Sequence, residues 1–311
     1  MRFIHMADIH FDSPFRVLTD KRDFGTKRRL EQREAFRKAI EYISKEEIPY
    51  LFIAGDLYDQ NYIRESTIEF INNLFKTIPN TEEELKEYIA KMKYLKEYLN
   101  SLDIRTLYFN TNSGTDFEVG LSEYSKWAIG NFTENQDDWF NFPTYEVYTA
   151  PDTRFARGKV VIEKPSTFYG QVLKQGELIF EKGKVVEVMA DAGKEMFLSD
   201  NKKWKEWILK EENKLNQIGE IALVSIDTPL SKLNKTFNNL LLDENTGCHI
   251  ALGYSLDECI SLPDCSKKEE YYFSDCAWHQ DVVFGNDSIN VECKTSTGKK
   301  KILMSNGIWK I

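Results

Sequence analysis

The first 80 residues alternate between short apolar runs and stretches with helical periodicity. Residues 2–6 and 50–54 are short and mostly apolar, which is typical of strands, and the second run (YLFIA) has the character of a buried parallel strand. Residues 27–44 and 65–77 place apolar side chains at helical spacing. The order strand–helix–strand–helix predicts a βαβα unit of the α/β class, in which ligands gather at the carboxyl ends of the strands.

The pattern changes after residue 80. Thr81 followed by Glu84 has the form of a capping box at the start of a long apolar-periodic run, so a helix is predicted over 82–102. A second helix is predicted over 202–218. Strands are predicted at 106–110, 116–120, 145–148, 159–162, 177–181 and 184–189, with several more before the C-terminus. The larger segment is therefore predicted to be an α+β, strand-rich domain.

Composition changes at the same place in the chain. Residues 1–80 contain eight of the eleven arginines but none of the six tryptophans or five cysteines. Acidic and basic side chains balance in this segment, so the whole net charge of −9 falls on residues 81–311. We therefore predict two segments of different origin, 1–80 and 81–311.

The overall charge and the cysteines limit the environment and the partners. A net charge of −9 and a pI of 5.2 argue against nucleic acid as a partner, because nucleic-acid-binding proteins are normally basic. No apolar run approaches membrane-spanning length, and the first residues are too few and too polar for a signal peptide. The five cysteines form no CxxC pair, which predicts free thiols in a reducing, cytoplasmic location.

Two short stretches near the N-terminus carry metal-ligand residue types. MADIH contains Asp8 and His10, and AGDLYD contains Asp56 after the second predicted strand. These stretches resemble the opening motifs of the calcineurin-like metallophosphoesterases, most closely the SbcD-type DNA exonuclease subunit. The resemblance implies that Asp8, His10 and Asp56 are metal ligands. The chain has only four histidines and no Gly-Asn-His triplet, so a second cation of that site would lack ligands, and a truncated phosphoesterase-like segment is expected.

A second set of polar residues interrupts apolar runs later in the chain. His249 lies in CHIALG, and His279 with Asp281 lies in CAWHQDVVFG, where the i, i+2 spacing places both side chains on one face of a strand. Glu146 and Glu220 lie in the apolar stretches TYEVYTAP and IGEIALV. Burying a carboxylate is costly without a cation or a full set of hydrogen bonds. For His279 and Asp281, the alternative to metal binding is a buried histidine paired with the aspartate.

Glu244, five residues before His249, is either a further site residue or a solvated loop residue. These stretches, together with KPSTFYG and DENTGCH, follow the order and rough spacing of motifs in the thermophilic metalloaminopeptidases, the aminopeptidase T family. The resemblance spans residues 81–311 and implies a metallopeptidase domain that removes N-terminal residues from peptides.

The resemblance also implies particular ligands and cofactors. It implies two divalent metal ions, Zn or Co with Mg or Mn as alternatives, and a homodimer. The implied ligands or neighbouring carboxylates are Glu146, Glu220, Glu244, His249, His279 and Asp281, with Glu220 as the bridging ligand. The family has a tyrosine seven residues after the histidine of CHIALG, where this chain has Leu256, and Tyr254 is the nearest phenol.

The chemistry of these residue types suits peptide hydrolysis. Histidine and carboxylate ligands hold Zn or Co, and a pair of such ions activates a water and polarises a carbonyl. A carboxylate then moves the proton, and either Glu146 or Glu220 could do so. Two other hypotheses stay open: an SbcD-like phosphodiesterase with an incomplete site, and an inactive fusion or truncation product.

Overall fold

The structure is a computed structural model of the chain, and it divides into two compact units, Met1–Ile89 and Ala90–Ile311. It describes residues 2–14, 24–58, 62–75, 81–130, 144–168, 171–173, 176–189, 206, 208–210, 214–237 and 239–311. The division between the units falls within helix α3 (Thr81–Ser101). The predicted domain boundary at residue 81 stays a prediction.

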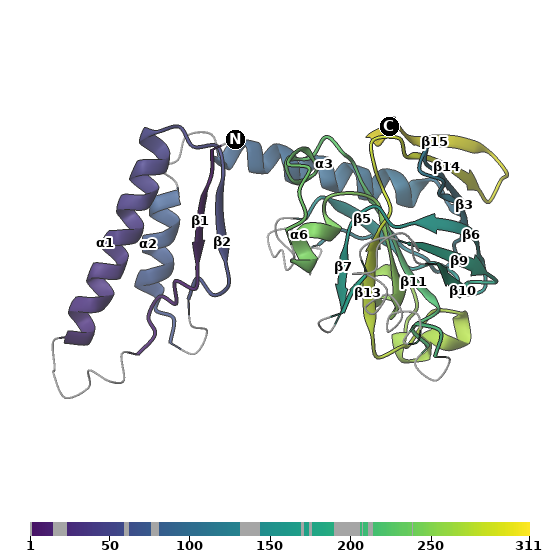
Figure 1. Ribbon diagram of the computed structural model, residues 1–311, viewed down its shortest axis with the longest axis horizontal. Helices are drawn as coiled ribbons and strands as arrows, with labels where there is room; N and C mark the ends of the chain where they lie inside the picture. Colours follow the sequence, from purple (N-terminus) through teal and green to yellow (C-terminus); the bar gives the residue numbers. More distant parts are fainter. Residues whose placement is uncertain are drawn as a thin grey trace. The chain divides into compact units, whose positions relative to one another are not determined.

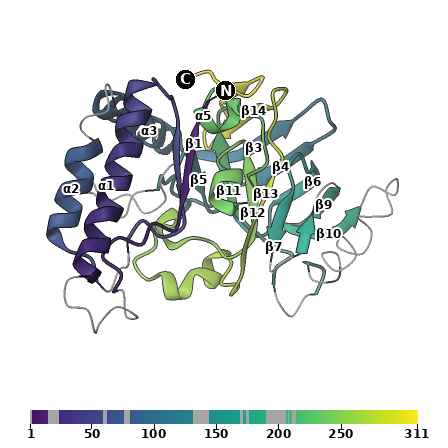
Figure 2. The same ribbon diagram turned by 60° about the vertical axis from the view of Figure 1, so that its left-hand side comes forward.

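The smaller unit is built from two strands and two helices. Strand β1 (Ile4–Ala7) pairs in parallel with β2 (Leu51–Ala54), and helices α1 (Phe24–Lys45) and α2 (Glu65–Phe75) lie on one side of this pair (Figure 1 and Figure 2). Apolar side chains from both helices, from the loop after β1 and from the connection between α1 and β2 are buried together: Phe11, Phe36, Ile40, Ile43, Ile48, Ile71 and Leu74. This core explains the helical periodicity of the segment, because its apolar positions face the strands.

The end of α3 belongs to the larger unit. Its last turns bury Met92, Leu95 and Leu99, which are three or four residues apart and so share one face. Asn100 then fixes the end of the helix to Trp127, because its side chain accepts from the backbone N–H of Trp127 at 2.9 Å and donates to the carbonyl of Trp127 at 3.0 Å.

The larger unit contains two large antiparallel sheets and one two-stranded antiparallel pair among its described residues. The first has eight strands in the order β10-β9-β6-β4-β3-β14-β15-β16. Their bounds are Ile104–Asn110 for β3, Asp116–Gly120 for β4, Ala156–Val161 for β6, Glu177–Glu181 for β9, Lys184–Met189 for β10, Asn290–Thr295 for β14, Lys300–Ser305 for β15 and Ile308–Trp309 for β16. A separate two-stranded pair joins β7 (Ser166–Phe168) to β8 (Gln171–Leu173).

The second sheet has four strands in the order β13-β12-β11-β5, and it carries the candidate site. The strands are β5 (Glu146–Thr149), β11 (Ile218–Val224), β12 (His249–Gly253) and β13 (His279–Val283), which lie side by side in Figure 2. Short helical turns occupy the connections: α5 (Pro229–Lys232), α6 (Leu240–Glu244), η4 (Asp257–Cys259) and η5 (Cys265–Tyr271). Nearly every residue of the four strands is buried, so polar side chains in them need a specific partner.

Aromatic rings join the two sheets of the larger unit. Phe109 and Phe117 come from adjacent strands of the eight-stranded sheet, and Phe284 directly follows β13. The ring of Phe284 packs edge-on against Phe109, with centroids 5.4 Å apart, and Phe117 packs against Phe180 at 5.0 Å. Such pairs are worth about 0.5–1.5 kcal/mol beyond their buried area. The end of β13 is thereby anchored to the large sheet.

The structure bears out the strand-rich α+β character expected for the larger segment and corrects one predicted element. The helix predicted over 202–218 cannot extend to its expected end, because Ile218 begins β11. Leu215 and Ile218 are both buried, which fits helical spacing, but Ile218–Val224 is buried on both faces and a short apolar run of that kind does not distinguish helix from strand. Much of 201–213, and the side chains of the capping box at Thr81 and Glu84, lie outside the described residues.

Two observations concern the cysteines and the possibility of a membrane-spanning helix. All five cysteines are free, as expected from their spacing. Among the helices that the structure describes, none combines the length and the apolar character needed to cross a membrane.

Candidate metal centre

One face of the four-stranded sheet collects the charged residues of the apolar runs. Residues directly opposite one another in adjacent strands share a face. Glu220 lies opposite Ala251, and Ala251 lies opposite Asp281. On the same face, Ala222 lies opposite His249 on one side and Tyr148 on the other. Small side chains at the middle positions leave room between the carboxylates and imidazoles of neighbouring strands.

The ligand atoms form two groups that share one carboxylate. Glu146, Glu220 and His249 make the first group, and Glu220, His279 and Asp281 make the second; within each group the ligand atoms all lie within 4.8 Å of one another. The Oε1 atom of Glu220 is 3.8 Å from His249 Nε2, and its Oε2 atom is 3.2 Å from His279 Nε2. His249 Nε2 is also 3.0 Å from Glu146 Oε2, and His279 Nε2 is 3.4 Å from Asp281 Oδ1.

Both imidazoles are oriented by backbone carbonyls. The Nδ1 atom of His249 donates to the carbonyl of Gly247 at 3.2 Å, and Nδ1 of His279 donates to the carbonyl of Tyr254 at 2.9 Å. These bonds leave each Nε2 facing the carboxylates, as is usual for histidines that ligate metals. Sequence reasoning missed these carbonyls, because a backbone acceptor can be supplied by any residue type.

Glycines allow the chain to approach closely around His279. Gly253 ends β12 with φ of +97°, and a Cβ atom there would lie 2.1 Å from the carbonyl oxygen of Trp278. Gly219, in the bulge that precedes Glu220, would place a Cβ atom 2.4 Å from the carbonyl oxygen of Gly253. Both positions therefore exclude a side chain, and together they hold β11, β12 and the residue before His279 in contact.

Glu244 is brought to the same cluster by the short helix α6. Asn239 caps the start of this helix by accepting from the N–H of Leu242, and Asp243 accepts from the N–H groups of Phe237 and Asn239. At its end, the fully buried Asn245 donates to the carbonyl of Leu241 at 2.9 Å and accepts from the N–H of Tyr145. The segment DENTG is therefore a built turn, and Glu244 is buried.

A hydrogen bond also joins Glu244 to the carboxylate of Asp281. Glu244 is thus a member of the cluster rather than a solvated loop residue.

Protonation in the cluster is strongly altered by burial and by neighbouring charges. Burial, together with repulsion from Asp281, raises the pKa of Glu244 to about 10. Burial also raises the pKa of Glu220. For His249, burial is the largest single effect and lowers the pKa, but the hydrogen bond to Glu146 and the attraction to Glu146, Asp281 and Glu220 together outweigh burial and raise it to about 10. For Asp281, burial opposes ionisation, but attraction to His279 lowers the pKa below its usual value.

The donor set fits a pair of divalent cations. Four carboxylates and two imidazoles converge, and the carboxylates outnumber the positive charges even when both imidazoles are protonated. Buried carboxylates that repel one another are stabilised either by taking up protons or by binding cations. Imidazole nitrogen with carboxylate oxygen is the ligand combination that zinc, cobalt and manganese accept.

The three N-terminal residues of the phosphoesterase resemblance lie in the smaller unit. His10 Nδ1 is 3.9 Å from Asp56 Oδ2, and a Cβ atom on Gly55 would lie 2.2 Å from Asp8 Oδ1. Among the described residues, however, only the two groups of the four-stranded sheet bring three ligand atoms within reach of one ion. A metal site formed by Asp8, His10 and Asp56 therefore stays a prediction.

The positions considered for the family tyrosine have other contacts. The side chain of Leu256 packs against an apolar cluster that includes Tyr148, Cys259 and Phe273. The hydroxyl of Tyr254 donates to Asp257 Oδ1 at 3.1 Å. What Tyr254 contributes to the cluster in this structure is its carbonyl, the acceptor for His279.

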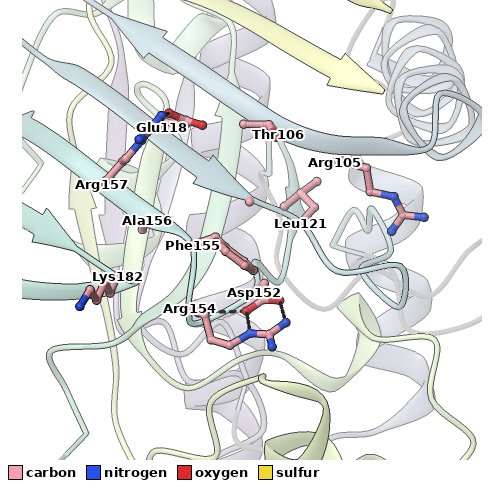
Figure 3. A pocket seen from close by; sticks show the side chains of 11 residues that line it. Arg105, Thr106, Glu118, Leu121, Asp152, Arg154, Phe155, Ala156, Arg157 and Lys182 are labelled. Carbon is pink, nitrogen blue, oxygen red and sulfur yellow. Dashed lines mark hydrogen bonds and ion pairs between the residues drawn. The ribbon is translucent and has the colours of Figure 1, made fainter. Parts of the chain in front are cut away.

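A separate pocket of about 570 Å³ lies over the eight-stranded sheet (Figure 3). Arginines at 105, 154 and 157 line it, and each has a carboxylate partner: Asp103, Asp152 and Glu118, respectively. Figure 3 shows the paired Arg154 and Asp152 beside Phe155. Because its arginines are already neutralised and it contains none of the clustered ligands, the pocket is a weaker candidate than the metal centre.

Comparison with known proteins agrees with the chemistry of the cluster. The sequence model of the thermophilic metalloprotease (M29) family matches residues 30–309. Aminopeptidase T of Thermus aquaticus is 31% identical over 217 residues, which are 69% of this chain and 51% of that protein. Aminopeptidase AmpS of Bacillus subtilis strain 168 is 29% identical over 218 residues, 68% of this chain and 51% of that protein. The chain spans about half the length of the curated relatives it matches.

The fold is similar to that of a solved structure. Wild-type AmpT from Thermus thermophilus aligns over 99% of this chain and 76% of its own length, with a TM-score of 0.66 and 24% identity. The comparisons lend no support to the phosphoesterase resemblance of residues 1–80, and the family match begins inside that segment, at residue 30. One family model thus covers residues 30–309 of the 311, and the chain belongs to the thermophilic metalloprotease (M29) family.

Proposed function

We propose that this chain is a metal-dependent aminopeptidase that releases N-terminal amino acids from peptides with the help of two divalent cations. The observation that carries the proposal is the position of Glu220, whose two oxygens face two different histidine–carboxylate groups. Family membership supports peptide-bond hydrolysis, and the named relatives are aminopeptidases. Because the chain is shorter than those relatives, its activity and substrates are part of the proposal.

The ligand assignment follows the two groups. Glu146 and His249 would hold one cation and His279 and Asp281 the other, with Glu220 bridging them. We favour zinc or cobalt, because each position offers one imidazole nitrogen together with carboxylate oxygens, and magnesium or manganese are the alternatives. Glu244, joined to Asp281 by a hydrogen bond, would support the second position.

Glu146 is the residue that moves a proton in the proposed reaction. A pair of divalent cations, when bound, polarises the scissile carbonyl and activates a water. Glu146 presents Oε2 to His249, while its Oε1 accepts only a long bond, 3.3 Å, from the hydroxyl of Thr144. We assign to Glu146 Oε1 the transfer of a proton from the attacking water to the departing amine.

The other predictions from the sequence remain proposals. A homodimer and a cytoplasmic location are expected from the family resemblance and from the cysteines. A phosphodiesterase is not favoured by any contact of Asp8, His10 or Asp56 described above, and an inactive fusion product is distinguished from an aminopeptidase by the following assay.

The assay compares three substrates. The full chain is freed of metal, reloaded with zinc or cobalt, and given an aminoacyl p-nitroanilide, its N-acetylated form, and bis-p-nitrophenyl phosphate. The proposal expects metal-dependent cleavage of the free-amine anilide alone. Cleavage of the acetylated anilide would contradict an aminopeptidase, cleavage of the phosphodiester would favour the alternative, and inactivity toward all three with no stoichiometric metal would indicate an inactive product.

A further inference from the structure

A buried lysine lies beside the candidate metal centre, outside the ligand set. Lysine is among the residues that are least often fully buried. Lys268, in η5, is only 2% exposed. Its ammonium group donates to the carbonyl of Ser255 at 2.9 Å and to Asp257 Oδ1 at 2.8 Å, and it lies 3.4 Å from the centre of the Tyr254 ring. These contacts compensate the buried charge and fall on one short segment of chain, and a longer ion pair, 3.9 Å, joins the ammonium group to Asp275 Oδ1 outside that segment.

That segment, residues 254–257, connects β12 to η4 and holds His279. The carbonyl of Tyr254 accepts from His279 Nδ1 at 2.9 Å, and the N–H of Tyr254 donates to the carbonyl of Trp278, the residue before His279. Lys268 therefore contacts the ring of Tyr254 and the backbone of the next residue, while the same Tyr254 orients the imidazole.

The two histidines differ in how much else holds them. The His249 side chain is 1% exposed and is confined by packing on all sides, whereas the His279 side chain is 26% exposed. A partly exposed imidazole can rotate into solvent when its orienting acceptor moves. His279 therefore depends on the Tyr254 carbonyl more than His249 depends on the Gly247 carbonyl.

We propose that Lys268 is a positioning residue for the metal centre: it fixes the 254–257 segment so that the Tyr254 carbonyl holds His279 with Nε2 directed at Glu220 and Asp281. The proposal rests on the proposed two-cation function for its consequence, but the orientation of His279 is a property of the metal-free chain. It assigns to Lys268 neither metal ligation nor contact with substrate. Its effect should be confined to the His279 side of the cluster.

The first test is made without metal. The chain has four histidines, so a long-range ¹H–¹⁵N spectrum of the metal-free protein contains four imidazoles, and His279→Gln assigns the one of interest. Lys268→Met removes the ammonium and keeps the length of the side chain. We expect the protected Nδ1–H signal of His279 to be lost to solvent exchange in this variant, while that of His249 is retained. Unchanged protection at His279 would overturn the proposal.

The matched control is Lys214→Met. Lys214 forms an ion pair with Glu269 of the same η5 helix, but its side chain is 46% exposed and does not contact the 254–257 segment in any described interaction. The substitution Lys214→Met therefore removes one positive charge near η5 and keeps the contacts between Lys268 and residues 254–257. Both histidine signals should be unchanged in this control.

The second test is a zinc titration with a competing chelator. Lys268→Met should weaken one of two sites by about 10–100-fold, as is typical when a residue behind a ligand is removed, and leave the other site unchanged. Equal weakening of both sites would show a general structural role, and weakening of neither would show that Lys268 does not support the metal centre; either result would refute the proposal. If the unsubstituted protein binds fewer than two zinc ions, the proposed function fails, whereas the metal-free spectrum still decides the role of Lys268.

A second variant serves if Lys268→Met does not fold. Asp257 is the carboxylate partner of Lys268, and its side chain is 53% exposed, so Asp257→Asn can be accommodated. Asp257→Asn weakens the contact between Lys268 and residues 254–257 by removing the charge of the carboxylate partner. The same spectrum and titration apply, with the same outcomes for and against the proposal.

Discussion

His249 and His279 present their Nε2 atoms to opposite oxygens of a single carboxylate, that of Glu220. The two histidines begin adjacent antiparallel strands, and Glu220 lies on the third strand of the same sheet. A carboxylate placed in this way can bind two cations at once, so its removal should affect both positions.

Replacing Glu220 with glutamine tests this shared role. Glu220→Gln keeps the shape of the side chain and removes its charge, so we expect bound zinc to fall from two ions per chain to fewer than one, and peptidase activity to fall by more than about 100-fold. Metal analysis after gel filtration and the aminoacyl anilide assay measure the two effects. Glu187→Gln, on the exposed face of β10, should change neither. Retention of both ions in Glu220→Gln would refute the bridging role.

Metal uptake should release protons and strengthen as pH rises. The pKa of Glu244 is raised to about 10 by burial, and that of His249 to about 10 by Glu146 despite burial, so both groups carry a proton at neutral pH. These protons oppose the binding of a cation, and affinity should increase by about tenfold per pH unit for each proton displaced. Calorimetric titration in buffers of different ionisation enthalpy counts the protons. Release of none at pH 7 would contradict this protonation of the cluster.

The close approach at Gly253 should be intolerant of any side chain. Gly253→Ala adds a clash with the carbonyl of Trp278 to the strain of a positive φ, and we expect it to reduce the free energy of unfolding by about 2–5 kcal/mol. Gly298 also has a positive φ, +83°, but no atom lies within 4 Å of its Cβ position. Gly298→Ala should therefore cost only about 1–2 kcal/mol. Urea denaturation of both variants separates strain from clash, and equal losses would show that the approach to Trp278 is not limiting.

Asn245 should matter for both stability and metal binding. It is fully buried and joins the end of α6 to the residue before Glu146, so Asn245→Ala removes the hydrogen-bond partner of the partly buried Tyr145 N–H and Leu241 carbonyl. We expect a loss of about 1–3 kcal/mol in the free energy of unfolding and weaker zinc binding, because Glu244 and Glu146 are both neighbours in sequence of the broken contacts. Asn112→Ala, at an exposed turn, is the matched control. Normal zinc affinity in Asn245→Ala would limit its role to stability.

Local patterns were sufficient for much of the fold. The strands at 177–181 and 184–189 begin and end where predicted, because each is a short run rich in β-branched or aromatic residues and a turn containing Gly183 separates them. The end of the helix predicted near Ile218 was wrong for the converse reason: β11 is apolar on both faces, and a short continuous apolar run carries no periodicity that distinguishes a strand from a helix.

The sequence by itself determined which residues needed an explanation. Glu146, Glu220 and His249 stand in apolar runs, and burial of a charged group without a partner is too costly to be accidental. Only the tertiary structure decided that these residues share a site, because the order β13-β12-β11-β5 depends on pairing between segments far apart in the chain. It also supplied the Tyr254 carbonyl and the buried Lys268, whose roles come from position alone. Local propensities act over a few residues, whereas the strand register that brings Glu220 between two histidines is set by the packing of the whole sheet.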